Sequence, residues 1–86
     1  MKIRLRYFAS IREIIGSEGE DFHTSAATLA QLRDELIARG GSYTDALARG
    51  RAVRMALNQT MAAESAALCE GGEGAEIAFF PPVTGG

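Results

Sequence analysis

One segment of this sequence has clear helical periodicity, and it lies between short segments whose apolar residues alternate. The helical segment reads TLAQLRDELIARGG, residues 28–41. Its apolar residues recur at the spacing of one helix face: Leu29, Leu32, Leu36 and Ile37. Thr28 and Gln31 have the spacing of a capping box, and Gly40 predicts the end of the helix. A helix with one apolar stripe must pack on an apolar surface of another element.

Three other segments alternate with a period of two, which is typical of strands with one buried face. They are KIRLRYF (residues 2–8), AVRMALN (52–58) and EIAFF (76–80). The side chains expected to point inward are Ile3, Leu5, Tyr7, Val53, Met55, Leu57, Ile77 and Phe79. EDFHT (20–24) predicts a further strand with Phe22 inward, and a very short strand is expected near Met61.

Two short helices complete the expected elements. SIREIIG (residues 10–16) has Ser10 and Glu13 at capping-box spacing and Gly16 as a stop signal. YTDALARG (43–50) predicts a second short helix. The order of strands around one main helix indicates an α+β domain, a mixed sheet with the helix packed on a single face.

The opposite face of that sheet has no predicted helix to cover it. The alternation places these residues on it: Arg4, Arg6, Phe8, Arg54, Ala56, Ala78 and Phe80. Apolar groups gathered on an exposed face suggest a docking site for a partner, although scattered exposed aromatics are also common in proteins without one.

Composition excludes several classes of protein. The 86 residues suffice for one domain, and the net charge of -2 gives no reason to expect nucleic acid or a membrane surface as partner. No apolar run approaches the ~20 residues that span a bilayer, and the charged N-terminus does not resemble a signal peptide. The single cysteine, Cys69, excludes an intrachain disulfide. We expect a cytoplasmic protein.

The sequence ends in FFPPVTGG, an apolar and stiff segment followed by two glycines. We therefore expect a domain at residues 1–80 and an extended tail at residues 81–86. Pro81 and Pro82 cannot continue a strand ladder and favour an extended path. The β-branched Val83 and Thr84 also prefer an extended backbone.

The two final residues, Gly85 and Gly86, are slender enough to enter a channel that excludes other residues. The functional group that the tail presents is the carboxylate of Gly86. An activating enzyme could convert this carboxylate with ATP into an acyl-adenylate, which a sulfur nucleophile attacks to give a thioester or thiocarboxylate. The rest of the sequence offers no competing site, because His23 and Cys69 stand in no recognised catalytic pattern. No metal-ligand spacing or phosphate loop is present, and EGGEG predicts a turn.

Several motifs resemble the ubiquitin-like sulfur carriers of the MoaD/ThiS family, and within it the small subunits of molybdopterin synthase. FFPPVTGG is similar to their C-terminal signature. YFASIREIIG (residues 7–16), TLAQLRDEL and ALNQ (56–59) are similar to their first strand and helix, main helix and third strand. The resemblance spans almost the whole chain, and it implies the β-grasp fold.

The resemblance also implies a chemical cycle in which the chain is not an enzyme on its own. An E1-like enzyme would adenylate Gly86 with ATP, and a sulfurtransferase or cysteine desulfurase system would supply the sulfur of a thiocarboxylate. The carrier would then donate this sulfur to cyclic pyranopterin monophosphate in the large subunit of molybdopterin synthase, within a heterotetramer of two small and two large subunits. No cofactor or metal is expected on the chain itself.

The resemblance gives roles to individual residues as well. Gly86 would carry the sulfur, and the segment Pro81–Gly85 would enter the partner. Phe80 and Phe8, with the arginines Arg4, Arg6 and Arg54 beside them, would form the docking face. CEGGEGAE (residues 69–76) departs from the family pattern, because this turn is longer and has Ala75 where an aspartate is usual.

Three alternatives share parts of this interpretation. The chain could carry sulfur for thiamine or for cysteine synthesis, although Pro-Pro before Gly-Gly favours the molybdopterin branch. It could instead be a protein modifier conjugated to lysines, or a simple interaction module. Isopeptide adducts would identify the modifier, and a terminus that is never adenylated would identify the interaction module.

Overall fold

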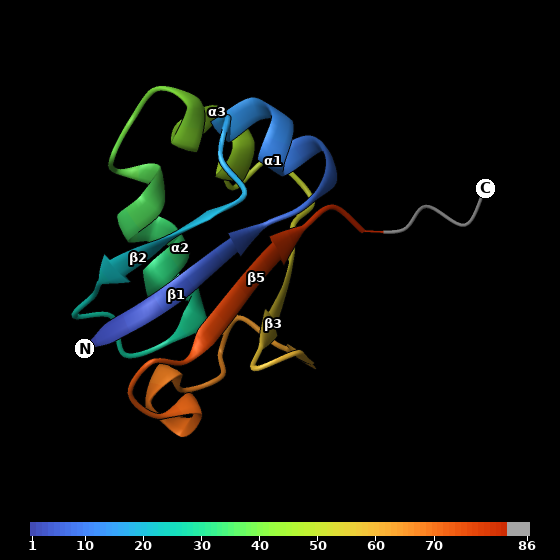
Figure 1. The fold of residues 1–86 in the computed structure, drawn as a ribbon. Coiled ribbons are helices and arrows are strands. Elements are labelled where there is room, and N and C mark those ends of the chain that lie inside the picture. Colours follow the sequence, from blue (N-terminus) through green and yellow to red (C-terminus); the bar gives the residue numbers. More distant parts are fainter. Residues whose placement is uncertain (83–86) are drawn as a thin grey trace.

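The computed structural model describes residues 1–82 and shows a five-stranded mixed sheet with helices (Figure 1). In chain order the elements are β1 (Lys2–Tyr7), α1 (Ala9–Ile15), β2 (Gly19–His23), α2 (Leu29–Ile37), α3 (Ser42–Leu47), β3 (Arg54–Leu57), β4 (Thr60–Ala62), the 3-10 helix η1 (Leu68–Gly71) and β5 (Glu76–Phe80). The two short helices and the short strand near Met61 are thus confirmed.

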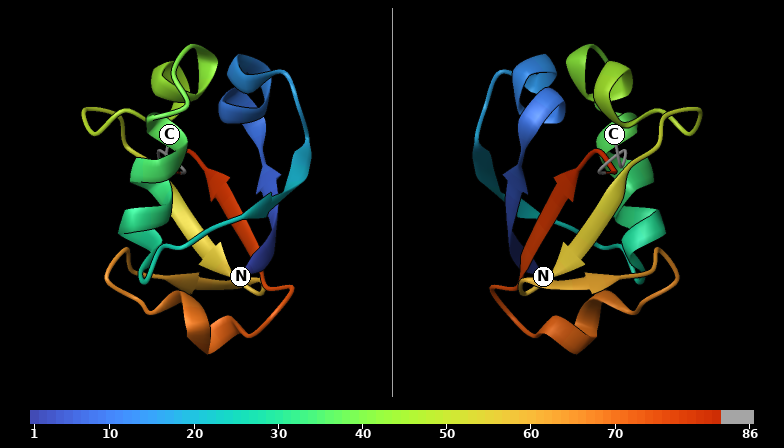
Figure 2. Two further views of the ribbon diagram at one scale, coloured as in Figure 1. Left: turned by 90° about the vertical axis from the view of Figure 1, so that its left-hand side faces the viewer. Right: turned by 90° about the vertical axis from the view of Figure 1, so that its right-hand side faces the viewer.

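The strands lie in the order β2-β1-β5-β3-β4. β1 and β5, the first and last strands of the chain, are parallel neighbours in the centre, and every other pair is antiparallel. Figure 1 shows α2 crossing behind the sheet, and the side views of Figure 2 show α1 and α3 close together at one end of the sheet. This arrangement is the β-grasp fold.

The core lies between α2 and the sheet and confirms most of the predicted inward residues. The fully buried apolar side chains include Ile3, Leu5, Tyr7, Leu29, Leu32, Leu36, Leu47, Met55, Leu68, Ile77 and Phe79. Phe22, Ile37, Val53 and Leu57 are only partly buried and pack against the margin of this cluster. Alternation in the strands and helical spacing in α2 therefore identify the two surfaces that meet in the core.

The predicted cap of α2 forms with one difference. The hydroxyl of Thr28 accepts a hydrogen bond from the backbone N–H of Gln31 at 3.2 Å. The Gln31 side chain accepts from the N–H of Ala27 at 2.8 Å, one residue earlier than in a standard capping box. The α-helix ends at Ile37, and Gly40, at φ +79°, follows in the turn rather than directly ending the helix.

The predicted capping box of Ser10 is wrong. α1 begins at Ala9, its N-cap residue is Phe8, and no side chain caps it. Ala9 has φ +51°, so the chain turns from β1 straight into the helix and Ser10 already lies within the first turn. Gly16 ends the helix with φ +82°, as predicted.

A buried arginine joins α2 to α3 and to the segment after it. Arg33 is only 3% exposed. Its guanidinium donates to the carbonyl oxygens of Leu47 at 2.8 Å, Ala48 at 2.8 Å and Arg51 at 3.0 Å, and to the carboxylate of Glu64 at 3.2 Å. The carbonyls of Leu47 and Ala48 lie at the C-terminal end of α3, where they have no partner within the helix, and that of Arg51 lies in the segment after it.

The long turn before β5 is held from both sides. The Asn58 side chain donates to the carbonyl of Gly71 at 3.1 Å and accepts from the N–H of Glu76 at 2.9 Å. Ala75 is only 2% exposed, so the aspartate usual in the family at this position would be a buried carboxylate here. The departure from the family pattern therefore fits the local structure.

Among residues 1–82, none of the helices has the length and apolar content that crossing a bilayer requires.

Candidate docking face and tail

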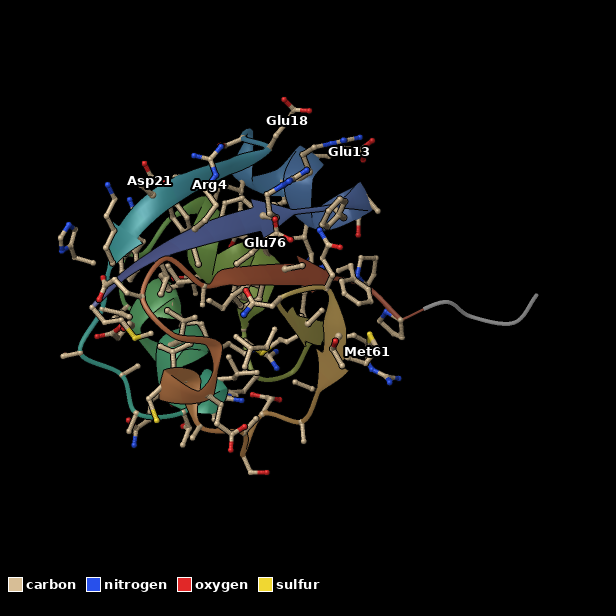
Figure 3. All side chains as sticks on the ribbon, turned by 60° about the horizontal axis from the view of Figure 1, so that its bottom comes forward. Arg4, Glu13, Glu18, Asp21, Met61 and Glu76 are labelled. Carbon is tan, nitrogen blue, oxygen red and sulfur yellow. The ribbon has the colours of Figure 1, made fainter. Side chains whose placement is uncertain are left out.

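The predicted open face of the sheet carries three rows of side chains that run across the strands. The register between strands sets these rows, because residues paired across the ladder point to the same side. Figure 3 looks onto this face, with Arg4 and Asp21 at one side and Met61 at the other. From the end nearest the tail, the rows are aromatic, apolar and charged.

The aromatic row contains Phe8 and Phe80, both predicted for the docking face. Phe8 is 39% exposed and Phe80 is half-buried. Their rings meet edge to face with centroids 6.5 Å apart. Arg54 is exposed and pairs in register with Phe80, which places this third predicted residue beside them. The guanidinium of Arg6 lies 5.5 Å from the centre of the Phe8 ring.

The apolar row contains a residue that the sequence analysis did not assign to this face. In register, Arg6 pairs with Ala78, Ala78 with Ala56, and Ala56 with Met61. Met61 is 50% exposed and extends the apolar area to the edge strand β4. The missed signal is the two-residue hairpin loop Asn58–Gln59 between β3 and β4, which fixes the pairing of Met61 with Ala56.

The two alanines lie on the predicted face but are themselves buried. Ala56 is 6% exposed and Ala78 is 7% exposed, although both lie on the face that the alternation predicts. A methyl group hardly rises above the backbone, and in register the two alanines stand between the longer side chains of Arg6 and Met61. They form a shallow apolar floor between taller residues.

The charged row contains Arg4, Asp21 and Glu76, which pair in register, and the guanidinium of Arg6 reaches Glu76 from the neighbouring row. Arg4 lies 3.1 Å from the carboxylate of Asp21, and Arg6 lies 3.5 Å from that of Glu76. Exposed pairs of this kind contribute little to stability, typically ~0–1 kcal/mol each. Arg54 has no ion pair among residues 1–82. The charges of Arg4 and Arg6 are therefore already paired with carboxylates, whereas the charge of Arg54 has no partner in the described part of the chain and could pair with a carboxylate of another protein.

A groove of about 440 Å³ adjoins the open face at β3 and β4. Its lining residues are Val53, Arg54, Met55, Met61, Ala62, Ala63 and Glu64. Because Arg54 and Met61 line both the groove and the open face, the two surfaces are continuous.

The predicted tail begins directly beside the aromatic row. The backbone N–H of Phe8 donates to the carbonyl of Phe79 at 3.1 Å, and β5 ends one residue later, before Pro81 and Pro82. Both prolines are half-buried. The predicted tail residues Val83, Thr84, Gly85 and Gly86 lie outside the described residues.

A cluster of ionisable side chains lies on the helix-covered side of the sheet. Glu20 accepts hydrogen bonds from Tyr43 at 2.6 Å, Arg39 at 2.9 Å and Tyr7 at 3.0 Å. Burial tends to raise the pKa of Glu20, but these hydrogen bonds outweigh burial and lower it. Burial and then the charge of Glu20 raise the pKa of the Tyr7 phenol. The cluster therefore holds an ionised carboxylate and two protonated phenols in a structural role.

The sequence assigns no role to His23 or Cys69. His23 is exposed at the end of β2, and Cys69 is an exposed free thiol in η1. Residues 1–82 contain no group of three or more His, Cys, Asp or Glu side chains placed to hold a metal ion.

Comparison with known proteins identifies the family. The model of the ThiS family matches residues 5–86, nearly the whole chain. The chain belongs to the ThiS family. This ThiS-family member is similar to two curated proteins that are both molybdopterin synthase sulfur carrier subunits.

The relative from Haemophilus influenzae is 37% identical over 84 residues, covering 98% of this chain and 99% of the relative. The relative from Escherichia coli is 34% identical with the same coverage. This agreement over the full length confirms the MoaD/ThiS resemblance on which the sequence analysis depends.

Solved structures agree with this family and with the β-grasp fold. SAMP1 from Haloferax volcanii has a TM-score of 0.76 at 24% identity, covering 100% of both chains, so it supports the fold alone. A second similar structure is a complex of subunits 1 and 2 of molybdopterin-converting factor from Helicobacter pylori. It matches with a TM-score of 0.62 at 28% identity and 100% coverage of both chains.

Proposed function

We propose that this chain is the sulfur carrier subunit of a molybdopterin synthase. The observation that carries the proposal is its full-length identity of 34–37% to two sulfur carrier subunits of that complex. An E1-like enzyme adenylates the carboxylate of Gly86 with ATP, and a sulfur nucleophile then displaces AMP. A sulfurtransferase or cysteine desulfurase supplies that sulfur as a persulfide, so the first product is an acyl disulfide. A second thiol then cleaves its S–S bond, which releases the thiocarboxylate and leaves a disulfide on the sulfur donor.

The tail gives the carrier its reach. Pro81 and Pro82 end the ladder and direct the segment away from β5 with little conformational entropy left to lose on binding. The six residues 81–86 extend at most ~20 Å. Gly85 provides a slender approach, so the sulfur on Gly86 can enter a buried pocket of the partner. There it attacks cyclic pyranopterin monophosphate, and two such deliveries build the dithiolene.

The open face provides the docking surface for the large subunit. Phe8, Phe80 and Met61 offer exposed apolar area beside the root of the tail, and Arg54 offers a cation without an ion pair among the described residues. Buried aromatics are the residues that most often dominate binding energy at an interface. Docking on this face fixes where the tail starts and therefore where Gly86 arrives.

In this proposal the chain has no catalytic activity alone and works within an assembly of two small and two large subunits. The complex of subunits 1 and 2 from Helicobacter pylori supports pairing with a large subunit. ATP is used by the activating partner, and the carrier binds no cofactor. Because the cycle needs ATP and reduced sulfur, we expect it to run in the cytoplasm.

Intact-mass analysis of the protein isolated from its native cell tests the proposal. We expect a species heavier by the exchange of one oxygen for sulfur, mapped to the C-terminal peptide. A chain lacking Gly86 and expressed in the same cell is the control and should lack this species. Recovery of Gly86 only in isopeptide bonds to other proteins would contradict the carrier function and favour a protein modifier.

A further inference from the structure

The strong nucleophiles of the described domain gather at one end of the sheet. Among nine Lys and Arg residues, only Lys2 is a lysine. Lys2 pairs in register with His23, and the α-amino group of Met1 donates to the carbonyl of Thr24 at 3.2 Å. These groups lie where β1 and β5 begin, at the end marked N in Figure 1.

The free thiol lies at this same end. Cys69 is in η1, two residues before Gly71, whose carbonyl accepts from Asn58 at 3.1 Å. Asn58 in turn binds the backbone of Glu76, the first residue of β5. Amines, imidazole and thiol are therefore all placed at the start of β5, while the tail leaves from its far end.

The cations nearest the tail are arginines. Arg54 pairs in register with Phe80, and Arg6 stacks on Phe8, which contacts Phe80. A guanidinium keeps its proton at any physiological pH and is not a nucleophile, whereas the amine of a lysine loses its proton far more easily and then attacks acyl groups. The arginines thus provide positive charge without acyl-accepting chemistry.

Strand length and the extended path of Pro81 and Pro82 together separate the two ends by more than the last four residues can cover. Lys2 begins β1, and the register pairs Arg4 with Glu76 and Tyr7 with Phe79, so Lys2 lies six strand residues away from the level of Phe80. Six strand residues span ~20 Å, and Pro81 and Pro82 add ~6 Å in the extended path that they favour. The four residues after Pro82 extend at most ~14 Å, and a lysine side chain adds about 6 Å to that reach.

We propose that this placement protects the activated C-terminus from its own domain: among residues 1–82, the cations within reach of the Gly86 acyl group are arginines, and the amines and the thiol lie at the far end of the sheet. The inference depends on the proposed function, because only an activated terminus needs such protection. It explains how the acyl-adenylate survives until an external sulfur nucleophile displaces AMP.

The reaction that is avoided is an internal aminolysis. The amine nitrogen would attack the acyl carbon of Gly86, a C–N bond would form, and the C–O bond to AMP would break. AMP would leave, the amine would lose a proton to solvent, and the chain would close into an isopeptide ring without its reactive end. No oxidant or reductant takes part.

A chemically prepared thioester at Gly86 tests this inference without the activating enzyme. The thioester exposes the same acyl carbon, and a thiol leaves in place of AMP. We compare the thioesters of wild type, K2R, R54K and the K2R/R54K double variant. The double variant has the same amino-acid composition as wild type, but its single lysine lies at the tail end of the sheet instead of the far end. The protein is dilute, and products are followed by intact mass and peptide mapping.

We expect R54K and K2R/R54K to cyclise through position 54, giving a product lighter than the free acid by one water. The short tether holds the lysine amine at position 54 at a millimolar effective concentration near the thioester. The rate of amide formation in these variants should therefore exceed that in wild type at least ~10-fold, and it should not depend on protein concentration. Wild type and K2R should give only the hydrolysed acid at equal rates. Cyclisation of wild type through Lys2 or Met1, or no gain in R54K, would overturn the proposal.

Because no activating enzyme is present, this result does not depend on whether Gly86 is adenylated in the cell. Failure of the proposed function would appear in the native mass spectrum, and failure of this inference would appear in the cyclisation rates.

Discussion

Phe80 connects the fold to the tail, because it ends β5, contacts Phe8 on the open face and precedes the two prolines. A residue in this position influences both where a partner binds and where the tail starts. In the proposed function, docking and tail delivery therefore depend on side chains at the same end of the sheet.

Replacing Phe80 with Ala should weaken binding to the large subunit by more than ~1 kcal/mol, which is at least ~5-fold in Kd, as expected for an interface aromatic. Isothermal titration with the purified large subunit measures this change. His23→Ala, an exposed residue at the opposite end, is the matched control and should bind as wild type. An unchanged Kd for Phe80→Ala, with its circular dichroism intact, would remove Phe80 from the docking face.

Deleting Gly86 should abolish sulfur transfer in a reconstituted synthase assay, because the shortened tail no longer delivers its carboxylate to the reacting position. The free energy of unfolding should change by less than ~0.5 kcal/mol, as for surface changes away from packed groups. Gly86→Ala keeps the length of the tail and its terminal carboxylate but adds a methyl group. Comparing it with the deletion shows whether sulfur transfer requires the length of the tail or the absence of a side chain at its end. Full transfer by the deleted chain would refute the mechanism.

Individual residues also show the limit of sequence reasoning. Phe8, Phe80 and Arg54 could be placed on the open face because strand alternation alone decides it. Met61 could not, because its face depends on the pairing set by Asn58 and Gln59, whose positive φ values of 49° and 69° are unusual for a residue such as Gln.

At the scale of elements, α2 was predictable because local signals agree: apolar spacing, the Thr28 cap and the following glycines. Its attachment to α3 was not predictable, because it depends on an arginine on the buried face. Nothing in the local sequence shows that Arg33 will meet carbonyls that are 14 to 18 residues away.

Replacing Arg33 with Ala should destabilise the fold by ~2–4 kcal/mol, because it leaves buried carbonyls at the end of α3 without donors. Urea unfolding followed by circular dichroism measures this loss. Arg33→Lys should recover only part of it, since an ammonium cannot reproduce the planar fork of a guanidinium. A loss below ~1 kcal/mol for Arg33→Ala would show that water replaces the guanidinium without cost.

At the scale of the whole molecule, one carboxylate joins parts that are distant in sequence. Glu20 on β2 binds Tyr7 of β1, Tyr43 of α3 and Arg39 of the turn between α2 and α3. The lowered pKa of Glu20 means that the folded state favours its ionised form. Its contribution to stability is therefore present above its ordinary pKa of 4.5 and is lost as the pH falls through the lowered value.

Replacing Glu20 with Gln should remove this acid dependence. We expect wild type to be the more stable protein at pH 6 and the difference to shrink as the pH falls below 4.5. Thermal unfolding between pH 2.5 and 7 measures both proteins, with Glu18→Gln, an exposed residue of the preceding turn, as the control. Parallel curves for wild type and Glu20→Gln across this range would contradict the role of Glu20.

The central pairing of β1 with β5 bears on how the protein is made. β1 leaves the ribosome first, yet its neighbour on one side, Glu76–Phe80, is synthesised last. During translation Leu5 and Tyr7 remain unpaired on this side until Ile77 and Phe79, their partners in the finished sheet, have been synthesised. The nascent chain therefore exposes an unpaired edge of β1 until β5 has been made, and chaperones that shield such edges should bind it at that stage.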